Sequence, residues 1–268
     1  MLLLSYNRYH ETYNSLKNIL LYVMCFMFHD LMSGHSHFAG IKHRKGINDA
    51  KRAKVFTKLA RPITIAAQEG GGNPDTNFKL RMAIDKARQF NMPKENIERS
   101  IKRGTGELKG DAIQEITYEA KGPGNILMLI GATTDNRNRA VSEIKSILNK
   151  LGGKMGEAGS SMWNFERVGS ILIEPGNREK DELELIAIDA GAKDTKMEES
   201  DLIIFTDPKD LQRVKSNLEK ENIKILEADL MFLPKSTVAI DEHTRLDYEK
   251  LLEALDDQDD VSEIYDNL

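Results

Sequence analysis

The sequence is poor in cysteine: Cys25 is the only one among 268 residues. A single cysteine excludes an internal disulfide and any zinc site that is built on paired cysteines. Chains without disulfides are typical of reducing compartments, so we expect a cytoplasmic protein.

Long hydrophobic runs are also missing. The apolar run at residues 19–28 has ten residues, whereas a membrane-spanning helix needs roughly 20, so we expect no membrane association. The run has the length of a signal-peptide core, but no convincing cleavage site follows it. Residues 1–31 are therefore a doubtful extension: a targeting segment, a dispensable extension or the product of a mis-set start codon. We favour the mis-set start, which puts the natural first residue at Met32.

The motifs that mark common enzyme active sites are absent from the sequence. It contains no G-x-x-x-x-G-K-[ST] phosphate loop and no G-x-S-x-G nucleophile turn. Gly104, Gly106 and Gly110 miss the G-x-G-x-x-G spacing by one residue. We therefore expect no catalytic residues, no cofactor and no enzymatic activity.

Histidine is scarce, yet three of the six lie close together at His35, His37 and His43. Three histidines could supply three zinc ligands, but no carboxylate or cysteine follows as a fourth ligand before Asp49. We interpret this segment as a polar arm that hydrogen-bonds to phosphates or bases, and we expect no metal.

Acidic residues are few in one part of the chain and abundant in another. Residues 32–110 contain 17 Lys and Arg against 7 Asp and Glu, whereas residues 111–268 contain 19 against 34. The overall net charge of −5 hides this division. The pattern indicates a basic module that is joined to an acidic body.

Residues 48–68 carry two stripes at helical spacing. The apolar residues recur every three or four positions, which predicts a helix with one face in a core. Lys51, Lys54, Lys58 and Arg61 form the second stripe, on nearly the opposite side of the same helix. One face of the helix therefore packs and the other presents cations.

The cationic stripe predicts a surface that binds nucleic acid. A solvated helix face is the alternative, but such faces mix both signs of charge, and this one is largely positive. Phe38 in the preceding arm offers a ring that could stack on a base. The predicted nucleic-acid-binding residues are Lys42, His43, Arg44, Lys45, Lys51, Arg52, Lys54, Lys58 and Arg61. The acidic runs at residues 198–201 and 256–260 are interpreted as solvated turns.

The local patterns predict helices first and mixed structure afterwards. Pro62 is expected to kink or break the first helix near Arg61. Asn73-Pro74 is expected to begin a second helix, and Gly104 to follow the end of a third. After a hinge at residues 104–110, strands and short helices alternate, and SSMWNFE and STVAI are both expected to be strands. Asp135 or Asn136 is expected to cap the first helix of this part. Two small α/β units fit the alternation better than one large sheet.

Several blocks of the sequence resemble the YebC family, which includes the mitochondrial translational activator of cytochrome c oxidase. The resemblance runs from Met32 to about Leu268. The blocks are GHSHFAGIKHRKGINDAKRAKVFTKLARPIT, GGGNPDTN, AIDKARQFNMPKENIERSIKRGTG, TDNRNRAVSEIKSILNKLGG and GEAGSSMWNFER.

The resemblance implies an α+β protein with three domains in a crescent. A basic helical domain at residues 32–110 would precede two small α/β, ferredoxin-like domains. The middle domain would comprise residues 111–164 plus 235–268, and the third domain, residues 165–234, would be inserted into it. The sequence departs from the usual family pattern at His37, Phe38 and Gly40, and it has Pro62 where the family usually has glutamate.

The resemblance implies a regulator of gene expression and leaves its target open. The family is labelled as DNA-binding transcriptional regulators, whereas other evidence on its members points to translation on the ribosome through difficult stretches such as consecutive prolines. We expect a nucleic-acid partner, either DNA or rRNA and tRNA, and the lysine-rich stripe favours RNA. The alternative is that the acidic body is the main binding surface, for a basic protein partner. A monomer is favoured.

Overall fold

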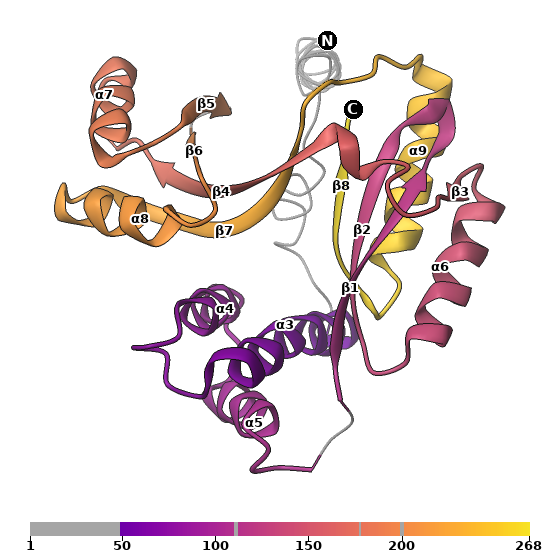
Figure 1. The fold of residues 1–268 in the computed structure, drawn as a ribbon, viewed down its shortest axis with the longest axis horizontal. Helices are drawn as coiled ribbons and strands as arrows, with labels where there is room; N and C mark the ends of the chain where they lie inside the picture. The colour runs from indigo at the N-terminus through magenta and orange to yellow at the C-terminus, as the bar shows by residue number, and fades with distance from the viewer. Residues whose placement is uncertain (1–48, 110–111, 177, 199–200) are drawn as a thin grey trace, which may run out of the picture.

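The structure is a computed structural model that describes residues 49–109, 112–176, 178–198 and 201–268. The predicted start at Met32, the polar arm and its residues Lys42 to Lys45 lie outside these ranges. Within them, seven α-helices and eight β-strands form a helical unit and two four-stranded sheets. The helical unit lies at one end of the first sheet and beside β7 (Lys224–Pro234) of the second (Figure 1).

The helical unit consists of α3 (Asp49–Gly70), α4 (Phe78–Gln89) and α5 (Lys94–Gly104). Its core is formed by the buried apolar residues of all three helices and of the α4–α5 connection. These are Leu59, Ile63, Ala66, Ala67, Leu80, Ile84, Ala87, Met92 and Ile97. The apolar stripe predicted on the first helix is therefore the face that packs against α4 and α5.

Of the kink or break expected near Arg61, the break is wrong, because α3 continues through Pro62 to Gly70. An interior proline removes one backbone hydrogen bond and costs a helix about 3 kcal/mol. Leu59 and Ile63 on either side of it are buried, and their packing in the core stabilises the helical path through the proline.

Two helix ends differ from the prediction. Helix α4 begins after Asn77, whose side chain accepts a hydrogen bond from the Leu80 amide at 3.0 Å. Asn73 instead closes the preceding turn, where its side chain accepts from the Asp75 amide. Gly104 is the last residue of α5 rather than the residue after its end.

Gly104 allows α3 and α5 to approach closely. A Cβ atom at this position would lie 2.3 Å from the Thr64 carbonyl oxygen and 2.7 Å from the Ala67 Cβ. The hydroxyl of Thr64 also donates to the Ser100 carbonyl of α5 at 3.2 Å. The glycine is therefore required by the distance between the two helices.

The first sheet has the strand order β3-β1-β2-β8, with every neighbouring pair antiparallel. Its strands are β1 (Gln114–Lys121), β2 (Leu127–Thr134), β3 (Lys154–Met155) and β8 (Val261–Asp266). Helices α6 (Arg137–Lys150) and α9 (Glu242–Asp256) cover one face (Figure 1). As predicted for this helix, Asn136 caps α6 by accepting from the Arg139 amide at 3.1 Å.

The second sheet has the order β5-β6-β4-β7, also antiparallel throughout. Its strands are β4 (Phe165–Glu174), β5 (Asp194–Glu198), β6 (Asp201–Thr206) and β7 (Lys224–Pro234). Helix α7 (Lys180–Ala190) follows β4, and α8 (Leu211–Lys220) follows β6. This succession of strand, helix, two strands, helix and strand is the ferredoxin-like arrangement.

Two expectations about strands in this region are corrected, and one strand was not expected. SSMWNFE contains a 3-10 turn, Met162–Asn164, before β4 begins. STVAI is not a strand, although the Val238 amide donates to the Asn267 carbonyl at 2.7 Å. Strand β5 was not expected, because its polar sequence DTKME has no apolar alternation.

The second sheet is inserted between parts of the first sheet, which confirms the predicted α+β class with one unit inside another. The chain enters the insertion by β4 and leaves it by β7, and Phe165 pairs with Pro234 where the two strands begin and end. Just outside this pair, buried Asn164 hydrogen-bonds through its side chain to Ser236 at 2.7 and 2.8 Å. The exact domain boundaries stay a prediction.

The two sheets share a layer of buried side chains. Strand β2 alternates its faces, so Met128 and Ile130 pack under α6 and α9 while Leu127 and Leu129 face the other way. Phe232 of β7 meets Tyr265 of β8 edge to face, with ring centroids 5.4 Å apart. Apolar packing therefore fixes the second sheet against the first.

Glu119 of β1 organises the loop that leads into the insertion. Its carboxylate accepts hydrogen bonds from the backbone amides of Gly159, Ser161 and Met162 at 2.6, 2.5 and 2.8 Å. Partial burial raises the pKa of Glu119, but the three amide donors outweigh this and leave its pKa below the ordinary value.

We expect Gly104→Ala to destabilise the protein by about 1–3 kcal/mol, because the added methyl group overpacks the contact between α3 and α5. Elsewhere in a helix interior the same change is normally stabilising by about 1 kcal/mol. Urea unfolding would measure whether Gly104→Ala lowers or raises the free energy of unfolding. Lys102→Ala, an exposed site on the same helix, is the control and should change stability by less than about 0.5 kcal/mol.

We also expect Glu119 to make stability depend on acid pH. A carboxylate whose pKa is lower in the folded state contributes stability above its unfolded pKa, about 4.3, and loses it as the pH falls through the folded value. Urea midpoints between pH 6 and pH 3 should therefore fall less steeply in Glu119→Gln than in the unmodified protein. If the urea midpoints of both proteins fell equally steeply with pH, the contribution of Glu119 to stability would be contradicted.

Candidate nucleic-acid interface

The cationic stripe of α3 lies against a turn from the far end of the chain. We call residues 256–260, with the sequence DDQDD, the acidic turn; it joins α9 to β8. Lys54 lies 3.6 Å from the Asp257 carboxylate and 3.4 Å from that of Asp259. Lys58 lies 3.5 Å from the Asp256 carboxylate. The stripe is thus bound to carboxylates of the same chain.

The backbone of the acidic turn adds to this attraction. The ammonium groups of Lys54 and Lys58 also donate to the main-chain carbonyls of Asp257 and Asp256, at the C-terminal end of α9. A helix C-terminus carries partial negative charge, and α9 has no basic residue in its last turn. Cations from α3 therefore take the place of the basic residues that commonly occupy this end of a helix.

Asp260 is the centre of the contact. Its side chain is 1% exposed and lies 3.0 Å from the Arg61 guanidinium and 3.1 Å from that of Arg139 on α6. Arg61 also donates to the main-chain carbonyls of Thr133 and Asp259 at 2.8 and 2.6 Å. A buried carboxylate needs such partners, because an unpaired charge inside a protein is costly.

The Arg139 guanidinium has two carboxylate partners at this contact. Hydrogen bonds to Asp260 and then to Asp135 raise the pKa of the Arg139 guanidinium above its ordinary value. The Asp135 carboxylate lies 2.8 Å from Arg139. Helices α3 and α6 therefore both direct an arginine to Asp260.

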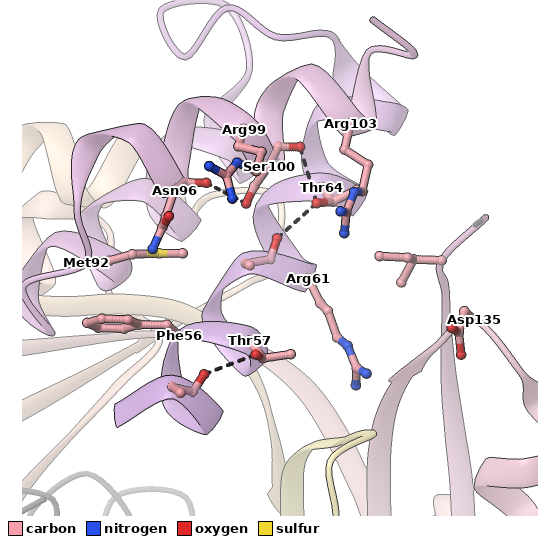
Figure 2. A pocket seen from close by; sticks show the side chains of 13 residues that line it. Phe56, Thr57, Arg61, Thr64, Met92, Asn96, Arg99, Ser100, Arg103 and Asp135 are labelled. Atoms are coloured by element: carbon pink, nitrogen blue, oxygen red, sulfur yellow. Dashed lines mark hydrogen bonds between the residues drawn. The ribbon is translucent and has the colours of Figure 1, made fainter. Parts of the chain in front are cut away.

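A groove opens beside this contact, between α3, α5 and the first sheet. We call it the basic groove; its volume is about 520 Å³. Figure 2 shows Arg61, Arg99 and Arg103 directed into it, with Phe56 and Met92 at one end and Asp135 on the opposite side. Its lining residues are Ala53, Phe56, Thr57, Ala60, Arg61, Thr64, Met92, Asn96, Arg99, Ser100, Arg103, Ile113 and Asp135.

Helix α4 makes a second charged contact, with β7 of the other sheet. Lys86 lies 2.8 Å from Asp229 and 3.2 Å from Glu227. Burial lowers the pKa of Lys86, but the carboxylates of Asp229, Glu227 and Glu263 outweigh burial and raise the pKa above its ordinary value. The helical unit is therefore joined to both sheets by cations on its own helices.

The nine predicted binding residues fall into three groups. Lys42, His43, Arg44 and Lys45 lie outside the described residues. Lys51 and Arg52 lie near the start of α3, where the structure does not describe side chains. Lys54, Lys58 and Arg61 are brought together, against the acidic turn. Their part in nucleic-acid binding stays a prediction.

Sequence reasoning missed Arg99, Arg103, Arg139 and Asp260. Arg99 and Arg103 lie four residues apart in the basic segment, a spacing that puts both on one helix face, and this signal was available. No signal in the sequence marks Asp260, which lies 199 positions after Arg61. The interpretation of residues 256–260 as a solvated turn is wrong for Asp260, because tertiary contacts bury it.

Within the described ranges, no group of three or more His, Cys, Asp or Glu side chains is arranged to hold a metal ion. The histidines His35, His37 and His43 lie outside those ranges. Among the described helices, none combines the length and the apolar composition that crossing a membrane requires.

The sequence matches the family models of all three units. Residues 36–107 match the TACO1/YebC protein N-terminal domain, and residues 113–268 match the TACO1/YebC second and third domain. The chain belongs to the TACO1/YebC family. The resemblance drawn from the sequence blocks is thereby confirmed.

Other TACO1/YebC sequences are similar over most of their length. A probable transcriptional regulatory protein of Thermotoga petrophila is 52% identical over 241 residues, which cover 88% of this chain and 93% of the relative. Another of that name, from Thermoanaerobacter pseudethanolicus, is 47% identical over 238 residues, covering 88% and 97%. Both are named as regulatory proteins and not as enzymes.

A solved structure supports the TACO1/YebC fold described above. The crystal structure of the conserved hypothetical protein Aq1575 from Aquifex aeolicus has a TM-score of 0.79 and 45% sequence identity. The similarity covers 87% of this chain and 96% of that one.

We expect Asp260→Ala to cost about 3–5 kcal/mol, because it leaves Arg61 and Arg139 without their buried partner. Asp257→Ala is the control; its side chain is 75% exposed, and its loss should cost less than about 1 kcal/mol. Urea unfolding gives both values, and amide hydrogen exchange should show faster exchange in α3 for Asp260→Ala. Equal effects of the two changes would contradict the central position of Asp260.

Proposed function

We propose that this chain is a non-enzymatic regulator of gene expression that binds RNA through its helical unit, as a translation factor on the ribosome. Its target would be rRNA or tRNA, and it would act in the cytoplasm as a monomer. The family's regulatory names support the general class, and the charges of the helical unit support the choice of RNA.

The observation that carries the proposal is the set of cations on α5. Arg99, Lys102 and Arg103 are exposed and follow one another at spacings of three and one. In the part of the chain that the structure describes, none of them has a carboxylate partner, unlike Lys54, Lys58 and Arg61. Cations of this kind are available to neutralise phosphates, which is the main source of affinity for nucleic acid.

The acidic turn argues for RNA and against a DNA duplex. A helix that reads duplex DNA places its basic face in the major groove. The basic face of α3 is covered by the acidic turn at Lys54, Lys58 and Arg61 and cannot enter a groove in this arrangement. Single-stranded loops of RNA are recognised by pockets and stacking side chains, which suit the basic groove.

The predicted arm and the start of α3 precede this surface in the sequence and carry further positive charge. Lys42, His43, Arg44 and Lys45 immediately precede the helix, and Lys51 and Arg52 begin it. We include all six in the proposed RNA-binding surface, because they continue the run of positive charge that ends in the basic groove.

A basic protein partner is the second candidate function. Leu185 and Ile188 on α7 are 64% and 60% exposed, and Asp181, Glu182 and Asp189 on the same helix are exposed beside them. An apolar patch with an acidic surround is suited to a basic, amphipathic protein segment.

Crosslinking in cells, followed by sequencing of the bound nucleic acid, tests the proposal. We expect reads concentrated in rRNA and tRNA. Sequence reads that map to promoter DNA would contradict the RNA proposal and identify DNA as the target. Crosslinks to basic proteins, without nucleic acid, would favour the acidic body as the binding surface.

We expect Arg99→Ala with Arg103→Ala to weaken RNA binding and reduce its salt dependence. Each phosphate contact contributes about 0.7 to the slope of log affinity against log salt for a single strand, so the slope should fall by about 1.4. Fluorescence anisotropy at several salt concentrations measures it. Lys94→Ala is the control on the same helix, because Lys94 is paired with Glu98 and does not line the groove. An unchanged slope in the double variant would refute the role of α5.

A further inference from the structure

The basic groove has the size and the lining of a site for a small polar ligand with one flat, apolar part. Its volume of about 520 Å³ falls within the roughly 300–1,000 Å³ that is usual for small-molecule pockets. Phe56 and Met92 lie at one end, Arg61, Arg99 and Arg103 are directed into the groove, and Asp135 lies on the opposite side (Figure 2). This division separates a region for stacking from a region for negative charge.

Phe56 provides the flat apolar surface. It lines the groove beside Met92 and is only half-buried, so part of the side chain is left uncovered by the protein (Figure 2). Met92 is 6% exposed and closes this end of the groove. A nucleic-acid base that stacks on an aromatic side chain would cover the remaining surface of Phe56.

The cations of the groove are not equivalent. Arg61 is held by Asp260, and the Asp135 carboxylate at the rim is bound to Arg139. Arg99 and Arg103 have no carboxylate partner among the described residues. An arginine in this state presents a planar fork of donors that matches a phosphate.

Asn96 lines the groove with a side chain that is available to hydrogen-bond to the edge of a base. The hydroxyls of Thr57, Thr64 and Ser100 all donate to main-chain carbonyls within the helices. The Asn96 carboxamide, by contrast, has no hydrogen-bond partner within the described part of the chain, and it lines the groove. A carboxamide can donate and accept at once, as the edge of a base requires.

We infer that the basic groove binds one unstacked nucleotide of single-stranded RNA. The base stacks on Phe56 with its edge at Asn96, and the adjoining phosphates bind Arg99 and Arg103. The inference rests on the proposed function and adds a defined contact to it. A free nucleotide has the same chemistry and is the other possible source of the ligand.

The test uses fluorescence anisotropy to measure binding of a labelled single-stranded RNA of eight nucleotides to the full chain. We expect Phe56→Ala, Arg99→Ala and Arg103→Ala each to weaken binding about tenfold, within the range for loss of one stacked base or one phosphate contact. Phe56→Trp should retain binding, because it keeps a stacking ring. Lys94→Ala should stay within about twofold of the unmodified protein.

A second probe tests stacking without relying on one variant. The same RNA is made with a single abasic position, moved along the strand in a series. For the unmodified protein, one position should weaken binding about tenfold, and for Phe56→Ala the same position should have no further effect. Thermal unfolding of each variant identifies those that bind RNA poorly only because they are unfolded. If Phe56→Ala is one of these, binding by Phe56→Trp and the abasic series measured on the unmodified protein show whether a base stacks in the groove.

The outcomes separate this inference from the proposed function. If the protein binds RNA but Phe56→Ala, Arg99→Ala and Arg103→Ala all behave like Lys94→Ala, the nucleotide site is wrong and RNA binding stands. If AMP or UMP binds with dependence on Phe56 and Arg103 while RNA does not bind, the site holds with a free nucleotide as ligand, and the proposed function fails. If neither RNA nor nucleotide binds, both are overturned.

Discussion

The contact between α3 and the acidic turn is the interaction on which the arrangement of this protein depends. A helix that ends in several carboxylates is unfavourable by itself, since the C-terminal end of a helix already carries partial negative charge. Lys54, Lys58 and Arg61 supply the missing positive charge from a different unit. Asp260 then fixes the geometry, because its carboxylate is buried and is shared by Arg61 and Arg139. Arg61 of this contact also lines the basic groove, where its guanidinium is held by Asp260.

Local patterns in the sequence predicted the elements but not all of their ends. The apolar stripe of α3 and the cap at Asn136 followed from spacing and residue type. Pro62 misled the prediction, because the core packing of Ile63 outweighs the intrinsic preference of proline. Strand β5 was missed, because its place at the edge of a sheet requires little apolar sequence.

The candidate site shows the limit of sequence reasoning more clearly. Segregation of charge was enough to locate a basic module, and most residues that line the groove belong to that module. The sequence could not show that Lys54 and Lys58 are neutralised within the chain, because their partners lie about 200 positions later. Among the described residues of the groove, Arg99 and Arg103 on α5 have no carboxylate partner, and their spacing was the signal that the prediction overlooked.

The order of the chain has a consequence for synthesis. Strand β8 is the neighbour of β2, and the acidic turn that covers α3 immediately precedes β8, so both are made long after α3. Domains generally begin to fold from the N-terminal side while synthesis continues. Helix α3 can therefore fold with α4 and α5 early, while its lysines stay uncovered by the acidic turn until that turn is made, about 200 positions later. For most of the time that the nascent chain exists, its basic surface is larger than in the finished protein.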